Sequence, residues 1–420
     1  MSNILILEGV YYPKPEANAI CSYKIAQQLI KNGHKVSVIC YKNFDLDNEN
    51  INGIEVHRIK SRMFFRLRFF GEKFKDKWYG KIVLKFAYFC NKIKILMRYN
   101  KFPFMSPMLT KSYVKKFEEI NEKGNFDMVI SVYNPFETCY AGAKIKTKYP
   151  QIKHVLYVVD TLTNTGYKKG FSKKKLEANG WKWEQYLYER ADLILNVKCH
   201  EEHHNNQRYD KYRNKMEFID IPFMTKPMFN EKNIIDKYLN KSKINGVYAG
   251  AFTCETNPNY CVDSILQISN LEIEMSFFSR GNFQKYLLNK SKESDMINSN
   301  GFIVHDEMIN VLQDVDFFVS IGRVGTQMII SKIFEYMSYG KPIIHFYKTD
   351  YDSSIKYYKN YSLALCIDER KQSTIESAKL IEEFLTENIK KKLKYEDIVK
   401  DFKENTPEYT VNYIENLLSK

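Results

Sequence analysis

Residues 331–346, SKIFEYMSYGKPIIHF, decide the fold because they join a helical pattern to a buried strand across a glycine and a proline. Two apolar runs flank the helix, DVDFFVS at residues 314–320 and PIIHF at residues 342–346. Gly340 stands where the helix is expected to stop. Strands that are apolar throughout are typical of a parallel sheet covered on both faces, so the sequence predicts a strand–loop–helix–strand unit of an α/β protein. The helical spacing is carried by Ile329, Ile330, Ile333, Phe334 and Met337.

The loop of this unit is the expected ligand site. In open α/β sheets, ligands bind at the carboxyl ends of the strands, and the exposed N–H groups of a following helix favour a phosphate. Glu335 lies one turn into the helix, where its carboxylate could accept hydrogen bonds from the hydroxyl pair of a ribose. The alternative is that Glu335 only occupies the solvated side of an amphipathic helix.

The same stretch resembles the SKxFEYMxxGKPII signature of GT-B glycosyltransferases of family 4. The resemblance implies that Glu335 holds the ribose of a sugar nucleotide. Many members have a second Glu eight positions earlier, at the donor sugar, where this chain has Gln327, which can bond a hydroxyl but carries no charge. The resemblance covers the second half of the chain well, and the first half only in its order of elements. It implies an α/β GT-B fold, in which two Rossmann-like doubly wound domains face each other across a cleft.

Length and composition agree with a two-domain protein of the cytoplasm. A chain of 420 residues exceeds what a single core usually supports, and its 44% hydrophobic residues are enough for two cores. No window holds the roughly 20 uninterrupted apolar residues of a membrane span. The chain begins directly with a strand pattern, NILILEG, so no signal peptide is expected. The eight cysteines include no CxxC pair and are expected to be reduced thiols.

Residues 1–224 alternate strand and helix patterns and are predicted to form a Rossmann-like domain that binds the acceptor. The loop after the first strand carries Glu16 and Asn18 where the family often has glycines, so these two are expected to contact the acceptor; capping of the next helix is the alternative. Asp160 ends a later strand, at a place where related transferases often have an acid or a histidine near the acceptor, or it caps the next turn. Residues 161–180, polar and rich in lysine, are predicted to be a flexible loop.

A basic aromatic region, residues 58–105, interrupts this domain. Residues 58–101 hold fourteen Lys and Arg against two acidic residues, a net charge of +12 out of +14 for the whole chain. From Trp78 onward, large apolar residues recur at helical spacing with lysines between them. Three interpretations remain open: a helix on an anionic membrane surface, where each basic residue adds about 1 kcal/mol, a core helix with a solvated lysine face, and a nucleic-acid surface. Because no RNA-binding signature occurs, we expect attachment to the inner face of the cell membrane and no nucleic-acid partner.

The segment CHEEHH invites a metal interpretation. On a helix, His200, His203 and His204 would share one face. A zinc site needs three or four converging ligands, and local clustering without a partner motif is weak support. The sequence therefore predicts no metal and no other cofactor.

Residues 243–395 are predicted to form the nucleotide-sugar domain, after a linker at residues 225–242. Its first loop lacks the Arg and Lys that the family often offers to the diphosphate, so the cation is expected from elsewhere, preferably an arginine. Val304 and His305, just after a short strand expected from Gly301, are expected to contact the base through backbone groups. Residues 396–420 are predicted to end in a helix that crosses back to the first domain. The remaining expected donor contacts are Gly250, Arg280, Arg323, Gly325, Ser331 and Lys332.

These expectations combine into a glycosyltransferase of surface polysaccharide synthesis. The sugar of a nucleotide sugar would move to a saccharide or lipid-linked saccharide, with Asp160, Gln327 and Glu335 nearest the chemistry. Cations and helix N–H groups would stabilise the negative charge that builds on the leaving diphosphate. The family resemblance implies retention of the anomeric configuration. A sugar-nucleotide epimerase with the same fold and a non-catalytic binding protein of a polysaccharide pathway are the alternatives.

Overall fold

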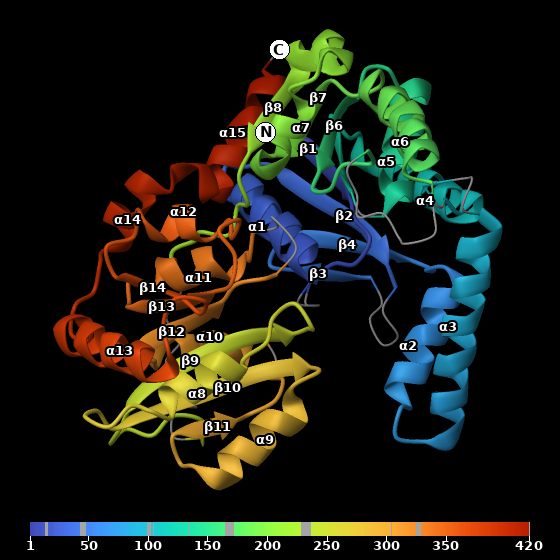
Figure 1. Cartoon of the computed structure of the whole chain (residues 1–420). Coiled ribbons are helices and arrows are strands. Elements are labelled where there is room, and N and C mark those ends of the chain that lie inside the picture. Colours follow the sequence, from blue (N-terminus) through green and yellow to red (C-terminus); the bar gives the residue numbers. More distant parts are fainter. Residues whose placement is uncertain are drawn as a thin grey trace. The chain divides into compact units, whose positions relative to one another are not determined.

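The computed structural model describes residues 1–12, 16–42, 48–98, 102–103, 105–133, 135–163, 172–227, 237–303, 305–324 and 329–419. The chain forms two compact units (Figure 1): Met1–Pro222 together with Pro407–Lys420, and Phe223–Thr406. Each unit is built on its own sheet, and the strands of both sheets are predominantly parallel. Among the described residues, none of the helices has the length and apolar character needed to span a bilayer.

The first unit contains an eight-stranded sheet of order β3-β4-β2-β1-β5-β6-β7-β8. Neighbouring strands run parallel except for the short edge pair β3 and β4. The strand order reverses between β1 and β5, so the carboxyl ends of these two strands form the topological switch point of the sheet. The bounds are β1 Asn3–Leu7, β2 Lys35–Tyr41, β3 Glu49–Ile51, β4 Ile54–Ile59, β5 Met128–Tyr133, β6 Lys153–Val158, β7 Leu193–Val197 and β8 Met216–Ile219.

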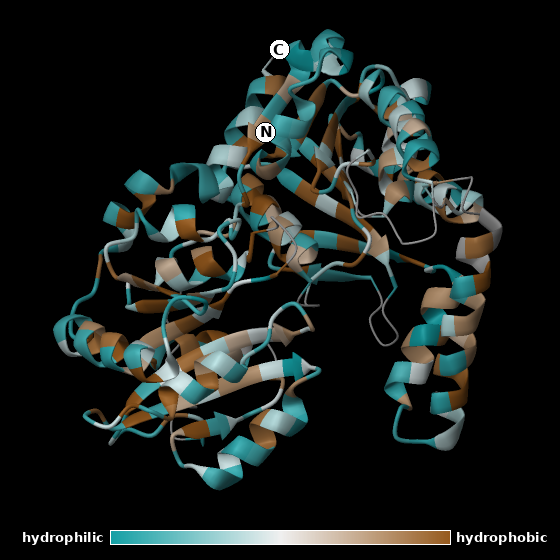
Figure 2. Ribbon diagram, viewed as in Figure 1, coloured by the Kyte–Doolittle hydropathy of each residue, from teal (hydrophilic) through white to brown (hydrophobic). Residues whose placement is uncertain are grey.

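Helices cover both faces of this sheet. One face packs against α1 and α15, whose Ile25, Leu29, Val411 and Ile414 join the core around β1 and β2. The other face packs against α4, α5 and α6. Figure 2 shows the apolar residues concentrated in the strands and on the inner sides of these helices. The bounds are α1 Ala17–Lys31, α2 Met63–Lys73, α3 Trp78–Arg98, α4 Pro107–Gly124, α5 Phe136–Lys148, α6 Lys173–Tyr188, α7 Glu201–His204 and α15 Pro407–Leu418.

The second unit contains a six-stranded sheet of order β11-β10-β9-β12-β13-β14, in which every pair is parallel. Its switch point lies between β9 and β12. The strands are β9 Ile244–Phe252, β10 Ile273–Gly281, β11 Ile297–Ser299, β12 Phe317–Ile321, β13 Ile343–Tyr347 and β14 Ala364–Asp368. The helices are α8 Asn259–Ile265, α9 Gln284–Glu293, α10 His305–Asp314, α11 Lys332–Ser338, α12 Ile355–Tyr358, α13 Thr374–Asn388 and α14 Tyr395–Asp401.

The stretch that decides the fold forms the predicted strand–loop–helix–strand unit. Strands β12 and β13 pair in parallel, with Phe318 opposite Ile343. Helix α11 ends at Ser338, and Gly340 follows at φ +70°, a conformation that favours glycine. A Cβ at Gly340 would lie 2.1 Å from the carbonyl oxygen of Leu393, so no larger residue fits there without movement. The predicted stop of the helix at Gly340 is confirmed.

Two local expectations are wrong. Part of the predicted loop at residues 161–180 is helical, because α6 already begins at Lys173, where Ser172 caps it by accepting a hydrogen bond from the N–H of Lys175. Lysine is a good helix former, so its abundance was poor evidence for a loop. Residues 301–303 are not a strand either: the strand lies earlier, at β11, and Gly301 adopts φ +67°.

The chain crosses back into the first unit at Pro407, whereas the sequence analysis placed the terminal segment at residues 396–420. Helix α14 stays in the second unit, where it packs against α11. The first unit receives α15 because Val411 and Ile414 are buried in its core.

Candidate functional site

A cavity of about 320 Å³ lies at the switch point of the first sheet. Residues that directly follow strands β1 and β5 line it, as expected for a ligand site in an open α/β sheet. The start of α1 and the outer part of α2 complete the wall. Glu16 and Asn18, two of the predicted acceptor contacts, are therefore brought together in one cavity. The lining residues are Glu8, Gly9, Val10, Glu16, Ala17, Asn18, Tyr41, Phe65, Arg68, Phe69 and Pro135.

Glu8 is the functional candidate that the sequence analysis missed. The residue is 1% exposed, its Oε1 accepts a hydrogen bond from the N–H of Gly9 at 3.0 Å, and its Oε2 accepts one from the hydroxyl of Ser22. Burial raises the pKa of the Glu8 carboxyl to about 8, although both hydrogen bonds oppose the shift. At neutral pH a large part of the protein therefore carries a neutral carboxyl, which can donate as well as accept a hydrogen bond. An acidic residue at the carboxyl end of a first, apolar strand was the available signal.

The backbone around Glu8 is fixed from the opposite side. Tyr113, fully buried on α4, donates its hydroxyl hydrogen to the carbonyl oxygen of Glu8 at 2.6 Å. The N–H of Glu8 donates to the carbonyl oxygen of Ile39 on β2 at 3.0 Å. With its carbonyl, its N–H and its carboxyl all bonded, Glu8 presents one defined orientation to the cavity.

Asp160 lies elsewhere in the same unit, beyond the end of β6, and is not among the residues that line the large cavity. It lines a much smaller space with Tyr133 and Glu184. Burial raises the pKa of the Asp160 carboxyl, and the charge of the nearby His200 opposes the shift. Glu184 fixes the loop that follows by accepting hydrogen bonds from the N–H groups of Leu162 at 2.8 Å and Thr163 at 3.1 Å. Asp160 thus borders the small space beside Glu184 rather than the candidate acceptor cavity.

The three histidines of CHEEHH point to different partners. Nε2 of His200 lies 3.2 Å from the carbonyl oxygen of Val159, and Nε2 of His203 lies 2.7 Å from the hydroxyl of Thr163. Nδ1 of His204 lies 2.8 Å from the carbonyl oxygen of His200. No group of three metal-ligating side chains converges within the described part of the chain.

In the second unit, Glu335 occupies the first turn of α11, the helix that follows β12 from the switch point. Its side chain is 14% exposed, and its Oε2 accepts a hydrogen bond from Nζ of Lys332 at 3.1 Å. The carboxylate is therefore mostly withdrawn from solvent and beside a cation, unlike a residue on a solvated helix face. Ser331 is the N-cap residue but makes no side-chain capping bond. At seven residues, α11 is shorter than the sequence suggested.

Tyr336 fastens α11 to the sheet. Its hydroxyl accepts a hydrogen bond from the N–H of Ala249 at 2.8 Å and lies 3.3 Å from the carbonyl oxygen of the same residue. Its ring stacks on Phe318 of β12, with ring centroids 4.5 Å apart. Because Tyr336 directly follows Glu335, these contacts set the position of the carboxylate relative to the ends of β9 and β12.

We expect Tyr336→Phe to lower the free energy of unfolding by about 1 to 3 kcal/mol, because the buried N–H of Ala249 loses its partner. Urea denaturation followed by circular dichroism measures this change. Tyr336→Leu is the control that also removes the ring stacked on Phe318, and its free energy of unfolding should fall further. A Phe variant as stable as the native protein would show that the stacked ring alone holds the helix.

The other predicted donor contacts surround the same edge of the second sheet. Gly250 lies near the end of β9, and a Cβ there would be 2.9 Å from the hydroxyl of Tyr248. Burial raises the pKa of that hydroxyl, and the nearby charge of Arg323 opposes the shift, so Arg323 lies on the same side of the strand end. Arg280 is the last residue but one of the neighbouring strand β10, with its guanidinium carbon 5.5 Å from the ring centre of Phe302.

The loops at the switch point are joined directly: the N–H of Val324 donates to the carbonyl oxygen of Glu255 at 3.2 Å. The structure thus collects Gly250, Arg323 and the α11 residues around one pair of strand ends. Gln327, Gly325 and Val304 lie outside the described residues. His305 begins α10, and its side chain is not described.

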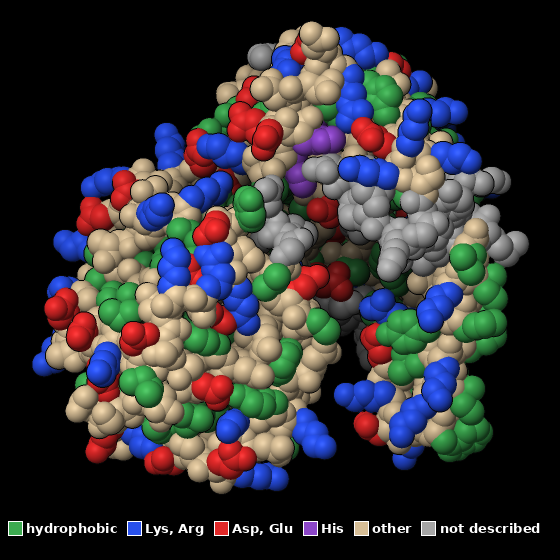
Figure 3. Space-filling model, in the orientation of Figure 1, with side chains coloured by type: hydrophobic (Ala, Val, Ile, Leu, Met, Phe, Trp, Pro, Cys, Tyr) green, Lys and Arg blue, Asp and Glu red, His purple; other side chains and the backbone are tan. Residues whose placement is uncertain are grey.

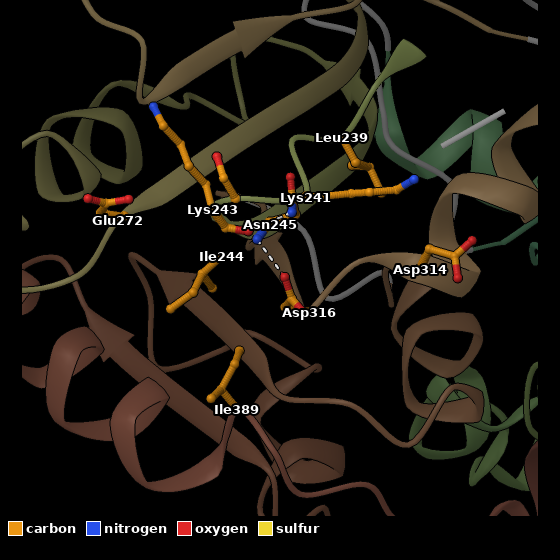
Figure 4. Close-up of a pocket in the computed structure, with 10 residues that line it drawn as sticks. Leu239, Lys241, Lys243, Ile244, Asn245, Glu272, Asp314, Asp316 and Ile389 are labelled. Atoms are coloured by element: carbon orange, nitrogen blue, oxygen red, sulfur yellow. Dashed lines mark hydrogen bonds between the residues drawn. The ribbon is translucent and has the colours of Figure 1, made fainter. Parts of the chain in front are cut away.

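Another cavity of the second unit, about 460 Å³, lies at the opposite edge of the sheet, where β9, β10 and β12 begin. Figure 4 shows Asn245 and Asp316 joined in its middle, with Glu272 and Asp314 on opposite sides. The side chain of Asn245 is already committed to the backbone, since it accepts from the N–H of Asn240 and donates to two carbonyl oxygens. These groups organise the start of the sheet, and the cavity is at the edge where α/β folds do not bind ligands.

Comparisons with known proteins support the architecture. The sequence matches no protein-family model, and no curated protein is significantly similar to it. Among solved structures, the chain is similar to the catalytic domain of starch synthase IV from Arabidopsis thaliana bound to ADP and acarbose, at 11% identity and a TM-score of 0.58, covering all of both chains. It is similar to a glycosyltransferase from Rickettsia africae, at 13% identity and a TM-score of 0.54, covering 99% of this chain and 95% of that one. It is also similar to the lipopolysaccharide outer core galactosyltransferase WaaB, at 12% identity and a TM-score of 0.53, covering 100% of this chain and 99% of that one.

At these identities the similarity establishes the fold and no more. The chain has the GT-B fold, with two Rossmann-like domains, as the sequence analysis predicted. The structures that share this fold include glycosyltransferases of several kinds.

Proposed function

We propose that this protein is a glycosyltransferase that moves a sugar from a nucleotide-sugar donor to a saccharide or lipid-linked saccharide. The observation that carries the proposal is the placement of Glu335: a carboxylate 14% exposed, beside Lys332, on the helix that leaves the switch point of the second sheet. Such a carboxylate can accept hydrogen bonds from both hydroxyls of a ribose. The starch synthase with the same fold was solved with ADP bound, which agrees with a nucleotide in a site of this kind.

The donor would be held by groups around the ends of β9 and β12. We assign the ribose to Glu335 and the diphosphate to Arg323 and Lys332, with Arg280 as a third cation and Ser331 as a hydroxyl contact. Gly250, near the end of β9, is assigned to the donor on the family resemblance. Gln327 is assigned to the donor sugar, and Val304 and His305 to the base, on the family resemblance.

The acceptor would occupy the cavity of about 320 Å³ in the first unit. Glu8, Glu16 and Asn18 offer it carboxyl and amide groups, which suit sugar hydroxyls. Asp160 is retained as a candidate near the reaction on the family resemblance alone. In the reaction, the bond between the anomeric carbon and the phosphate oxygen breaks, and a bond to the acceptor oxygen forms. The nucleoside diphosphate leaves with the electron pair and takes up the proton of the acceptor hydroxyl.

Family 4 membership, retention of configuration and a role in bacterial-type surface polysaccharide synthesis at the inner face of the cell membrane are parts of the same proposal. WaaB, with the same fold, is a galactosyltransferase of the lipopolysaccharide outer core, which agrees with an acceptor of this kind. The positive charge that the leaving diphosphate requires would come from Arg323 and Lys332, so the proposal assigns no metal to the reaction.

Thermal unfolding in the presence of UDP-, GDP- and ADP-sugars tests the donor site. A nucleotide sugar that binds should raise Tm, because a ligand at 100 times its Kd stabilises the native state by about 2.7 kcal/mol. Incubation of that nucleotide sugar without acceptor then separates transfer from epimerisation, since only an epimerase would convert the sugar. If neither nucleotide sugars nor nucleoside diphosphates raise Tm, the protein is not a transferase of this kind.

A further inference from the structure

Helices α2 and α3 form a hairpin that extends from the first unit (Figure 1). The two helices pack on each other through glycines: a Cβ at Gly71 would lie 2.6 Å from the side chain of Leu84, and one at Gly80 would lie 1.9 Å from the carbonyl oxygen of Phe74. Tyr79 adds ring contacts with Phe70 and Phe74. The hairpin therefore has a defined inner face, and the rest of α3 is left for another partner.

The outer face of α3 is a continuous apolar stripe. Its residues recur at intervals of four and three, so they fall on one side of the helix. Each is exposed, by 38% to 74%. This exposure excludes the interpretation of α3 as an ordinary core helix. The stripe consists of Trp78 (74%), Ile82 (56%), Phe86 (55%), Phe89 (61%), Ile93 (38%) and Leu96 (69%).

A row of lysines runs beside the stripe. Lys77, Lys81, Lys85 and Lys92 are exposed and each directly precedes a stripe residue, so they lie along one flank of it. Residues 63–98 as a whole hold ten Lys and Arg against two acidic residues, a net charge of +8. Figure 3 shows apolar side chains along the outer edge of the hairpin, with Lys and Arg side chains beside them.

We propose that the α2–α3 hairpin binds the surface of an anionic lipid bilayer, with the stripe in the acyl boundary and the flanking lysines at the headgroups. A basic amphipathic helix with aromatic and aliphatic residues on its apolar side lies in the plane of such an interface. Lysine side chains can place their ammonium groups at the headgroups while their carbon chains stay in apolar surroundings. Each basic residue near an anionic surface adds to the attraction.

The charge of the hairpin favours lipid over two other partners. A second copy of the chain, stripe to stripe, would bring two surfaces of net charge +8 together, which costs free energy. Nucleic acid would use the lysines, but it offers no apolar phase to Ile82, Ile93 and Leu96. An anionic bilayer satisfies both the apolar stripe and the basic flank.

The hairpin also reaches the candidate acceptor cavity. Phe65, Arg68 and Phe69 of α2 form part of the wall of that cavity together with Glu8 and Glu16, and Nε of Arg68 also donates to the carboxylate of Glu72 at 3.0 Å. Resting on the proposed function, the inference therefore specifies the acceptor: an amphiphile whose anionic group meets Arg68 and whose sugar meets the carboxyl side of the cavity. The bilayer bound by α3 would be the source of this acceptor.

Co-sedimentation of the full chain with vesicles tests the inference. The protein should bind vesicles of phosphatidylcholine mixed with phosphatidylglycerol much more strongly than vesicles of phosphatidylcholine alone. Binding to the anionic vesicles should weaken at high salt. The combined variant Trp78→Ser, Phe86→Ser and Phe89→Ser should bind at least about tenfold more weakly. Its control replaces three equally exposed apolar residues outside the hairpin, Leu288→Ser, Tyr351→Ser and Ile375→Ser, and should bind as the native protein does.

Several results overturn the inference: no binding to anionic vesicles, equal binding by the stripe variant, or a stripe-dependent dimer or RNA complex in place of vesicle binding. A second measurement does not depend on the variant's fold: the tryptophan emission of the native protein, to which Trp78 contributes together with Trp181 and Trp183, should shift to shorter wavelength on anionic vesicles. Nucleotide-sugar binding, measured by thermal shift without lipid, keeps the two proposals apart. If donor binding persists while vesicle binding fails, only the membrane inference falls; if vesicle binding succeeds without donor binding, the transferase proposal falls.

Discussion

Replacing Glu335 with alanine should weaken nucleotide-sugar binding by at least about 100-fold. A charged acceptor contributes roughly 1.5 to 3 kcal/mol for each hydrogen bond, and a ribose offers two hydroxyls to Glu335. Since about 1.4 kcal/mol corresponds to a factor of ten in Kd, the loss of both bonds reaches this range even at the low end. Isothermal titration calorimetry with the best nucleotide sugar from the thermal-shift screen measures it.

Two further variants separate the role of the carboxylate from its ion pair with Lys332. Glu335→Gln keeps the shape and one acceptor oxygen, so its Kd should fall between those of the native protein and the alanine variant. Lys332→Met removes the ammonium group that lies 3.1 Å from the Glu335 carboxylate. It should weaken the binding of nucleoside diphosphates more than the binding of the nucleoside. Unchanged Kd for Glu335→Ala, in a variant with native Tm, would remove the observation on which the transferase proposal rests.

Much of the architecture could be predicted from the sequence because it is encoded in local patterns. The apolar runs around residues 331–346 indicate burial on both faces, which is typical of a parallel sheet covered by helices. Gly340 marked the end of α11 because few other residues adopt φ +70°. Such signals act over a few residues, and they are independent of what the rest of the chain does.

The composition of the candidate site in the first unit could not be predicted in the same way. Glu8, Arg68 and Pro135 are separated by 60 or more positions in the sequence, and only the strand order β2-β1-β5 brings their elements to one cavity. The raised pKa of Glu8 depends on burial that the full sheet and α4 create. Similarly, the lysines of residues 173–175 fit a loop or a helix, and the cap that Ser172 provides belongs to a helix.

The exposure of α3 is a further feature that the sequence alone did not decide. Its helical spacing was visible in the sequence, but the same spacing fits a buried helix and one that faces a membrane. The close approach of α2 and α3 at Gly71 and Gly80 explains the outcome, because the hairpin satisfies its inner face by itself and leaves the stripe exposed.

Glu8→Gln should remove a large pH dependence of stability. In the unfolded chain the carboxyl ionises near its ordinary value of 4.5, whereas in the folded protein its pKa is about 8. Between these values the folded protein keeps a proton that the unfolded chain releases, so raising the pH favours unfolding. Below pH 4.5 the carboxyl is neutral in both states, and above pH 8 the full cost of burying the charge is present. The native protein should therefore lose a few kcal/mol relative to the Gln variant between about pH 5 and pH 8.

Urea denaturation at several pH values across this window measures the difference between native protein and variant. Glu122→Gln is the matched control, because Glu122 is exposed on α4 and does not line the cavity, so its replacement should leave the slope with pH unchanged. Identical slopes for the native protein and Glu8→Gln would mean that Glu8 itself is a carboxylate at neutral pH. The acceptor proposed for it could then not place an anionic group near β1, because two negative charges would meet in a buried space. The pH dependence of stability therefore decides whether the cavity accepts an anionic ligand at Arg68 or excludes one because Glu8 is charged.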